Sequence, residues 1–444
     1  MINRFLKIFL ACAFFFVNLQ ANAVLPEERF KVFWLEPHTL NQGVTGRVRA
    51  PDKEDLNRIF ARFSEMGVTT VVIAYSELLD YYFYEPSQLL KNNYPRSSVT
   101  VHTLSDGTKF FDGIFYAAEN NNVDIIVGLS QFGDGEVISR ITGQMRGSQA
   151  SGMNDFDSIV SASNLAELNK QKLLGQIMGA DIYNKYGQSP SFKGWYLAQE
   201  PHCLDVAMKL FGPIANFLKG IDSSKKIMIS PNADAEVCFA PKVYDQGQLI
   251  SNLHNQLNSM KQNNIDIIAY QDSLGAGFQA GMLQFNSFAG GYAGLLSNYL
   301  LPNLSHYHYS DLARTMRLNY LRYIIFPGIK LAHAGTGVEF WINTELWRMD
   351  GYCPPIFPAR YGCNYAGLDE NDQLTTWYNF INPDQLMLNE SMMQFDFPEA
   401  NISLTNTGIL QGKYARQVAR AFTNYYLNRL GLPVITYDPY VPPE

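Results

Sequence analysis

Short, continuous apolar runs alternate along the chain with longer stretches in which apolar residues recur every three or four positions. The first pattern is typical of strands buried on both faces of a parallel sheet, and the second of helices that pack by one face. Each apolar run ends in polar residues, so the chain is predicted to repeat the order strand, loop, helix. The eight predicted strands are 30–35, 68–75, 123–129, 194–200, 226–230, 265–270, 338–345 and 392–397.

Helical periodicity predicts helices at 52–66, 110–120, 164–185, 242–261, 310–326 and 414–430. Eight strands with covering helices predict a (β/α)8 TIM barrel that forms one domain, residues 24–444, with loop insertions. An open doubly wound sheet is the alternative. That fold would carry a glycine-rich phosphate turn after its first strand, and Glu36-Pro37-His38-Thr39 is not such a turn.

The N-terminus has the three parts of a secretory signal peptide. Arg4 and Lys7 form a basic start, residues 8–17 form an apolar run, and residues 21–23 form the cleavage sequence Ala-Asn-Ala. The apolar run is shorter than the roughly 20 residues that a membrane-spanning helix needs. We therefore expect residues 1–23 to be removed and the mature chain to be secreted or periplasmic, without a membrane span.

The charge balance argues against anionic partners. The chain has 34 basic and 41 acidic side chains, and removal of Arg4 and Lys7 leaves 32 against 41, a net charge of −9. Nucleic acids and anionic membranes attract basic surfaces, so neither is an expected partner. The oligomeric state stays open.

Four cysteines remain after the predicted cleavage: Cys203, Cys238, Cys353 and Cys363. An even number in an exported chain favours two disulfides, for which three pairings are possible. We favour Cys353–Cys363 as a local clasp, with Cys203–Cys238 joining the loops after two successive strands. The cysteine spacings match no common zinc motif, and the sequence implies neither a metal nor an organic cofactor.

Polar residues collect where the predicted strands end, among them Glu36, Glu77, Gln131, Glu200, Asn232, Asp234, Gln271, Asp272 and Glu345. Strand ends are solvated, so most of these residues need no function. Two glutamates stand out by strand phase, because side chains alternate with period two. Glu200 ends the face that begins at Gly194, and Glu345 ends the face of Trp341. Glu339 lies six residues before Glu345, about 20 Å down the strand, so the two cannot serve one site.

Paired carboxylates are the groups that cleave glycosidic bonds, one as a protonated acid and the other as a nucleophile or base. The fourth and seventh strands of a barrel lie across its mouth, so Glu200 and Glu345 can face each other over a substrate. Aromatic residues make up 14% of the chain. Trp195, Trp347 and the run at residues 81–84 can either stack on sugar rings or belong to the core.

Gln199-Glu200-Pro201 resembles the Asn-Glu-Pro signature of clan A glycoside hydrolases. In that clan the fourth barrel strand ends in the acid/base glutamate and the seventh in the nucleophile. Gln199 stands where the clan has the asparagine that contacts the sugar 2-hydroxyl.

Further motifs resemble a bacterial family of barrel proteins that is known as a domain of unknown function and proposed to contain glycoside hydrolases. The resemblance covers most of residues 28–430. It rests on Tyr84-Glu85-Pro86, Val127-Gly128-Leu129, Gly194-Trp195-Tyr196, Gln271-Asp272-Ser273-Leu274-Gly275 and Trp341-Ile342-Asn343-Thr344-Glu345.

The residues and the resemblance together favour an exported, retaining glycoside hydrolase that acts on a poly- or oligosaccharide. Glu200 is the predicted general acid/base and Glu345 the predicted nucleophile. The predicted substrate-binding residues are Gln271, Asp272, Trp347, Asn232, Asp234, Gln199 and Glu36.

Two other functions remain open. One is a non-catalytic carbohydrate-binding barrel of an envelope polysaccharide system. The other is a polysaccharide lyase, which the acidic balance disfavours because a lyase needs basic residues around a uronate.

Overall fold

The structure is a computed structural model of the 444-residue chain. It describes residues 30–35, 37, 51–65, 68–78, 81–94, 100–130, 136–148, 153–198, 204–231, 246–271, 335, 337–345, 347–348, 380–381 and 401–405. The predicted signal peptide, the four cysteines and the helices predicted at 310–326 and 414–430 lie outside these residues.

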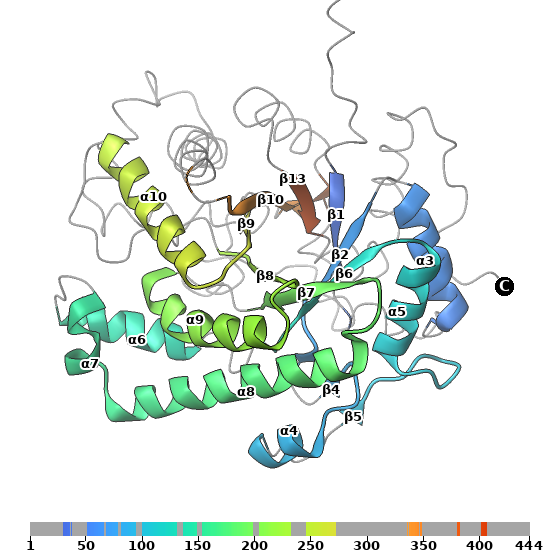
Figure 1. Ribbon diagram of the computed structural model, residues 1–444, viewed down its shortest axis with the longest axis horizontal. Helices are drawn as coiled ribbons and strands as arrows, with labels where there is room; N and C mark the ends of the chain where they lie inside the picture. Colours follow the sequence, from blue (N-terminus) through green and yellow to red (C-terminus); the bar gives the residue numbers. More distant parts are fainter. Residues whose placement is uncertain are drawn as a thin grey trace, which may run out of the picture.

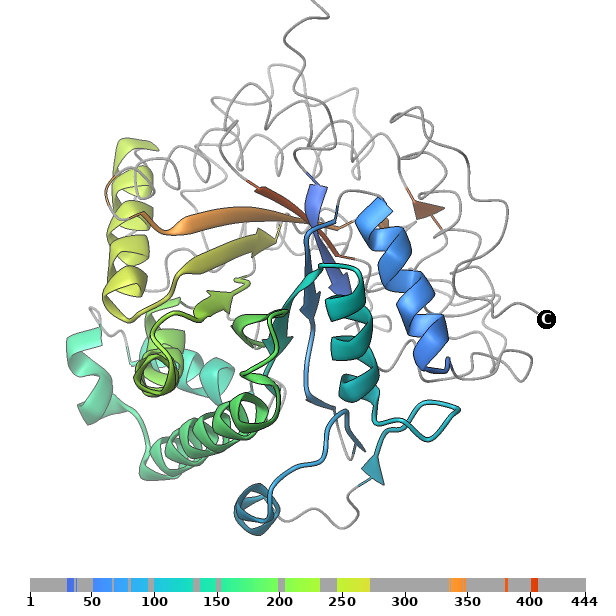
Figure 2. The same cartoon turned by 45° about the vertical axis from the view of Figure 1, so that its right-hand side comes forward.

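Eight parallel strands close into a barrel in the order β1-β13-β10-β9-β8-β7-β6-β2, which confirms the predicted TIM-barrel architecture. Figures 1 and 2 show these strands at the centre of the molecule with helices outside them. The barrel strands are β1 Phe30–Leu35, β2 Thr70–Ile73, β6 Asp124–Gly128, β7 Phe192–Leu197, β8 Lys226–Ile229, β9 Ile267–Gln271, β10 Glu339–Glu345 and β13 Asn401–Thr405.

The strand register gives the barrel its stagger. Starting at Trp34, register partners in one direction lead to Gly194 on β7. In the other direction they lead through β13 to Glu345 on β10. Glu339, six residues earlier on β10, is level with Tyr196, two residues beyond Gly194. One circuit therefore advances by eight residues, which is the shear of a TIM barrel.

The eighth strand was predicted in the wrong place. The barrel is closed by β13 Asn401–Thr405, whereas the predicted segment 392–397 lies outside the described residues. Only Ile402 and Leu404 of β13 are apolar, and they alternate with Asn, Ser and Thr. This pattern lacks the continuous apolar run that is typical of a parallel strand buried on both faces. The segment 392–397 is richer in apolar and aromatic residues, so it was selected instead.

Side chains on the barrel strands divide into two buried sets with the period of two that strands impose. One set packs outward under the helices and includes Phe33, Leu35 and Ile73. The other contains residues from seven strands and none from a helix, so it fills the barrel interior. Its members are Val32, Trp34, Val72, Ile126, Tyr196, Ala198, Met228, Ile267, Ala269 and Trp341.

The described α-helices are α3 Lys53–Glu65, α4 Gln88–Asn93, α5 Phe110–Asn120, α6 Glu136–Gly147, α7 Phe156–Ile159, α8 Ala162–Tyr186, α9 Leu204–Ile221 and α10 Gln246–Gln262. A reciprocal pair of hydrogen bonds starts α3: the Asp55 N–H donates to Oδ1 of Asp52 at 2.8 Å, and the Asp52 N–H donates to Oδ2 of Asp55 at 2.9 Å. These bonds satisfy two donors at the helix start, as an N-cap residue does. None of the described helices is long and apolar enough to cross a membrane.

Helix α9 was not predicted. Gly212 and Pro213 lie in its middle, and both residues normally interrupt a helical pattern. The helix packs closely against α8, as Figure 1 shows. A Cβ added to Gly175 of α8 would lie 2.6 Å from Cδ1 of Ile214, and one added to Gly179 would lie closer still to Cδ2 of Leu218. The two glycines therefore leave room for these α9 side chains.

Two small sheets accompany the barrel. Strands β3 Glu77–Leu78, β4 Tyr81–Tyr82 and β5 Thr100–Val101 form a three-stranded sheet that follows β2 in the chain. Strands β11 Trp347–Arg348 and β12 Phe380–Ile381 form an antiparallel pair, of which β11 comes just after β10. Both sheets begin shortly after the carboxyl end of a barrel strand, the face on which TIM barrels carry their chemistry.

Candidate functional site

Two of the predicted site residues end barrel strands. Glu345 is the last residue of β10 and is level with Thr405 of β13, while Gln271 is the last residue of β9 and is level with Asn343. Trp347 lies two residues beyond Glu345, on β11. The structure thus places the backbone of these three positions at the carboxyl ends of neighbouring strands β9 and β10.

The remaining predicted site residues lie outside the described residues; they are Glu200, Gln199, Glu36, Asn232, Asp234 and Asp272. Their strands are described up to a few positions before them. Ala198, two residues before Glu200, is 2% exposed and belongs to the barrel interior. Strand β10 and strand β7 are separated by β9 and β8, so their ends lie across the barrel mouth from each other.

An aromatic pair lies in the interior near this face. The rings of Trp34, the penultimate residue of β1, and Tyr196 of β7 meet edge to face, with centroids 4.8 Å apart and an interplanar angle of 83°. Both side chains are buried. Sequence reasoning did not select Trp34, although strand phase places it on the same face as Val32 and Glu36.

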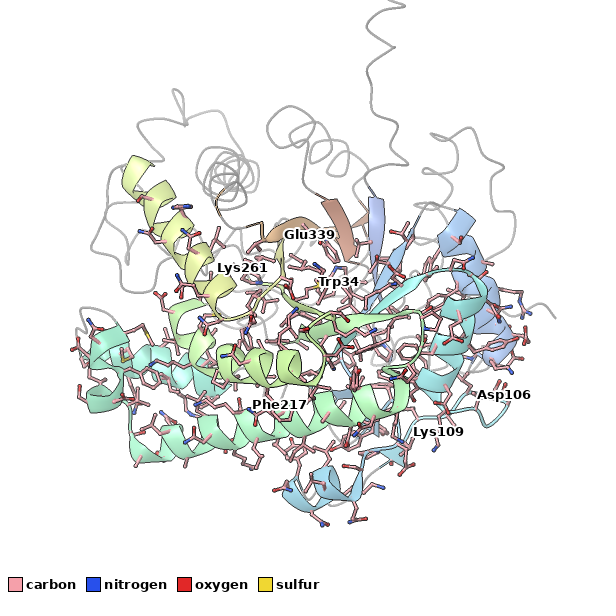
Figure 3. The ribbon with its side chains drawn as sticks, viewed as in Figure 1. Trp34, Asp106, Lys109, Phe217, Lys261 and Glu339 are labelled. Atoms are coloured by element: carbon pink, nitrogen blue, oxygen red, sulfur yellow. The ribbon has the colours of Figure 1, made fainter. Side chains whose placement is uncertain are left out.

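The other end of β10 is occupied by a contact that serves the fold. The indole N–H of Trp341 donates to Oε1 of Glu339 at 2.7 Å. Glu339 is the first residue of β10, so it lies at the amino end of the strand, as Figure 3 indicates by its label. This position agrees with the expectation that Glu339 and Glu345 cannot serve one site.

A buried acid lies between the carboxyl ends of β2 and β6. Glu77 is 2% exposed, and its carboxylate accepts a hydrogen bond from the Ser130 hydroxyl. Beside it, the Ser76 hydroxyl donates to the carbonyl of Gly128. A Cβ on Gly128 would overlap the carbonyl of Ala74, so only glycine allows β2 and β6 to approach here. We therefore assign Glu77 a structural role in joining the carboxyl ends of β2 and β6.

Several predicted aromatic candidates belong to the core. Trp195 is fully buried on the outer side of the barrel, and its indole N–H donates to the carbonyl of Gly179 at 3.1 Å. Its alternative role in sugar stacking is therefore wrong. In the run at residues 81–84, Tyr82, Phe83 and Tyr84 are buried, and only Tyr81 is exposed.

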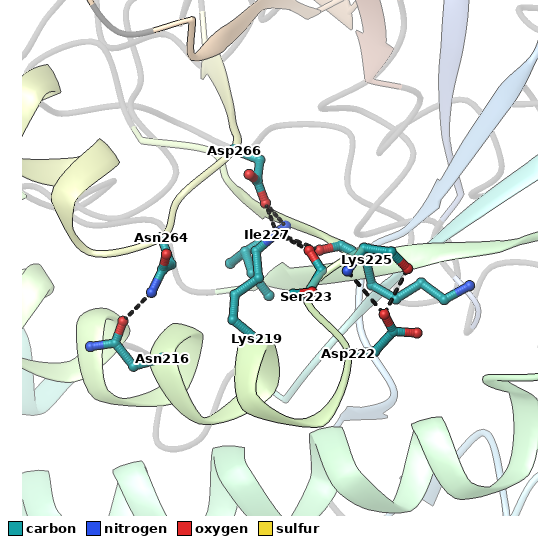
Figure 4. Close-up of polar contacts among 9 residues, drawn as sticks. Asn216, Lys219, Asp222, Ser223, Lys225, Ile227, Asn264 and Asp266 are labelled. Atoms are coloured by element: carbon teal, nitrogen blue, oxygen red, sulfur yellow. Dashed lines mark hydrogen bonds and ion pairs between the residues drawn. The ribbon is translucent and has the colours of Figure 1, made fainter.

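The opposite, amino-terminal face is closed by polar contacts, which Figure 4 shows. Lys219 of α9 forms an ion pair with Asp266 at 2.7 Å and donates to the carbonyls of Ser223 and Lys225 at 3.1 and 2.7 Å. Oδ2 of Asp266 also accepts the Ile227 N–H at 2.9 Å. These contacts join α9 to the starts of β8 and β9. Such a network supports stability on the face that does not carry chemistry.

No group of three or more histidine, cysteine, aspartate or glutamate residues is placed to hold a metal ion within the described ranges. What the arrangement offers chemically is a barrel mouth at which β9 and β10 end in Gln271 and Glu345, with the buried Trp34–Tyr196 pair in the interior.

The comparisons with known proteins fit this architecture. The family model described as a domain of unknown function, DUF4434, matches residues 49–354. No curated protein matches the chain.

Among solved structures, a proposed α-L-fucosidase from Bacteroides thetaiotaomicron shares 15% identity and a TM-score of 0.53, with 93% of this chain and 97% of that chain covered. A glycoside hydrolase family 5 protein from Bacteroides vulgatus shares 9% identity and a TM-score of 0.42, covering 87% of this chain and 62% of the other. Because the identity in the first comparison is low, its TM-score supports a shared fold alone.

Proposed function

The chain belongs to the DUF4434 family. Because of this family membership and its closed eight-stranded barrel, we propose that the protein is a glycoside hydrolase. The observation that supports the proposal most directly is the position of Glu345. It ends β10, the seventh strand of the barrel along the chain, at the mouth where TIM-barrel enzymes carry their catalytic groups. Glu200, two residues beyond the interior residue Ala198, would face it from the end of β7.

The proposed reaction is a retaining hydrolysis in two steps. The Glu345 carboxylate attacks the anomeric carbon while Glu200 protonates the glycosidic oxygen, so the bond to the leaving group breaks and a glycosyl ester of Glu345 forms. Glu200 then takes a proton from water, whose oxygen attacks the same carbon and releases Glu345. Retention requires the two carboxyl groups to lie about 5–5.5 Å apart.

Other strand-end residues complete the proposed site. Gln271 and Asp272 would position the sugar, and Gln199 would take the place of the clan A asparagine. Asn232, Asp234, Glu36 and Trp347 would bind more distant parts of a poly- or oligosaccharide. We further propose that residues 1–23 are removed on export and that Cys203–Cys238 and Cys353–Cys363 form disulfides in the exported protein.

A panel of 4-nitrophenyl glycosides tests the proposal. The α-L-fucoside is the first to assay, because the B. thetaiotaomicron neighbour is a proposed α-L-fucosidase. Glu345→Gln and Glu200→Gln should each lower kcat by about 10²–10⁴-fold, since each removes a group that acts in the transition state.

Glu339→Gln is the matched control. It changes a glutamate on the same strand at the other end of the barrel, and glutamine can still accept the Trp341 N–H, so activity should stay within a few-fold of the wild type. Equal activity of the Glu345 and Glu339 variants would remove Glu345 from the mechanism. Sugar binding without release of any product would instead favour the carbohydrate-binding barrel.

A further inference from the structure

Trp34 carries a buried hydrogen-bond donor without an acceptor. Its side chain is 5% exposed, and within the described part of the chain its indole N–H has no hydrogen-bond partner. Buried polar groups in folded proteins are nearly always paired, and an indole N–H can only donate. An acceptor is therefore missing at this point of the barrel interior.

The other two tryptophans whose side chains are described have partners. Trp195 donates to the Gly179 carbonyl under the helices, and Trp341 donates to Glu339 at the amino end of β10. The contrast shows that the fold pairs its tryptophans where no ligand is expected. Trp34 differs from Trp195 in facing the barrel interior, and from Trp341 in lying near the carboxyl end of its strand.

The register places Trp34 beside the proposed nucleophile. Trp34 of β1 is level with Thr405 of β13, which is level with Glu345 of β10. Neighbouring strands lie about 4.8 Å apart, so the Cα atoms of Trp34 and Glu345 are separated by about 10 Å. A tryptophan and a glutamate at this separation, on the same face of the sheet, can contact one sugar ring.

Resting on the proposed function, we propose that the Trp34 indole N–H donates a hydrogen bond to a hydroxyl oxygen of the sugar bound at Glu345. The edge-to-face contact with Tyr196 fixes the plane of the Trp34 ring, so the donor is oriented before the sugar arrives. The ligand class is a pyranose with a hydroxyl directed toward β1. Trp34 thus acts as a specificity-determining residue at the floor of the site.

The test compares two identical substitutions, Trp34→Phe and Trp195→Phe, in the full mature chain. The probes are L-fucose, D-galactose, D-glucose, D-mannose and D-xylose, each titrated into protein labelled with 15N at the tryptophan indoles. The Trp34 signal is assigned by its loss from the Trp34→Phe spectrum. Affinities come from the same titrations, and melting temperatures report on folding.

We expect the bound sugar to shift the Trp34 indole proton and Trp34→Phe to weaken its affinity about 3- to 10-fold, the effect of one lost neutral hydrogen bond. Trp195→Phe should leave affinity unchanged and lower the melting temperature, because it removes the hydrogen bond to the Gly179 carbonyl and part of a fully buried side chain. A sugar that binds equally well to Trp34→Phe and does not move the Trp34 signal would overturn the inference.

That outcome is separable from failure of the proposed function. Loss of turnover in Glu345→Gln with unchanged affinity in Trp34→Phe would retain the hydrolase and reject the Trp34 contact. Absence of both sugar binding and glycoside turnover would reject both.

Discussion

Replacement of Lys219 by methionine should destabilise the barrel strongly, although it touches none of the proposed chemistry. The ammonium group lies 2.7 Å from Asp266, and both side chains are only 14% exposed. The change leaves the Asp266 carboxylate without its cation and the carbonyls of Ser223 and Lys225 without their donor. Asp266 itself ties the Ile227 N–H to the start of β9.

The loss of unfolding free energy in Lys219→Met follows from the burial of the Lys219–Asp266 pair. Two unit charges 4 Å apart interact by about 4 kcal/mol at the effective dielectric constant of about 20 that suits protein surfaces. Loss of one partner from a buried pair costs about 3–5 kcal/mol. Because some water reaches both groups, we expect the lower end, about 3 kcal/mol of unfolding free energy.

Urea unfolding, followed by circular dichroism and tryptophan fluorescence, measures this cost. Lys193→Met is the matched control, since Lys193 pairs with Asp124 at 3.2 Å while the two side chains are 45% and 41% exposed. An exposed pair contributes about 0–1 kcal/mol. The double variant Lys219→Met/Asp266→Asn should recover part of the loss, because no uncompensated charge remains. Equal costs for Lys219→Met and Lys193→Met would mean that burial of the Lys219–Asp266 pair does not set the loss of stability.

Three further predictions concern the core. The Tyr84 hydroxyl is buried without a partner in the described residues, whereas that of Tyr186 donates to Asp112 at 2.7 Å. Tyr84→Phe should therefore stabilise the fold by about 1 kcal/mol, and Tyr186→Phe should destabilise it by about as much. Urea unfolding measures both changes. Burial raises the pKa of both phenols, so the folded state favours their neutral form. This contribution to the free energy of unfolding is complete below the ordinary tyrosine pKa of about 10 and should fall as pH rises above it. Melting temperatures in alkaline buffers measure the fall. Gly128→Ala should cost about 3 kcal/mol or prevent folding, because its Cβ would meet the Ala74 carbonyl, and a wild-type yield and melting temperature would contradict the tight approach of β2 and β6.

Seven of the eight barrel strands could be predicted because a strand buried on both faces must be continuously apolar. Strand β13 Asn401–Thr405 breaks that rule with alternating polar residues, so its position depends on pairing with β1 and β10, which no local pattern encodes. Helix α9 was missed for a related reason. Its Gly212-Pro213 pair opposes helix formation locally, and packing against α8 overrides that preference.

The candidate site was predictable only to the level of strand ends. Position along the strand was enough to select Glu345 over Glu339, which shares its phase, and β10 runs between these two residues. Trp34 could not be selected in the same way. Trp34 stands out because its indole N–H lacks a hydrogen-bond partner and because the strand register places it level with Glu345 two strands away. Both facts are properties of the closed barrel.

Trapping of a covalent intermediate is the sharpest test of whether Glu345 is the nucleophile of a retaining glycoside hydrolase. A 2-deoxy-2-fluoro glycosyl fluoride of the sugar selected by the aryl glycoside panel slows both steps and releases its leaving group without help from an acid. The intact mass of the protein should rise by one fluoroglycosyl group, and peptide mapping should place this group on Glu345, with no labelling of Glu345→Gln. A label on another carboxylate, or a hydrolysis product with inverted anomeric configuration, would contradict this role of Glu345.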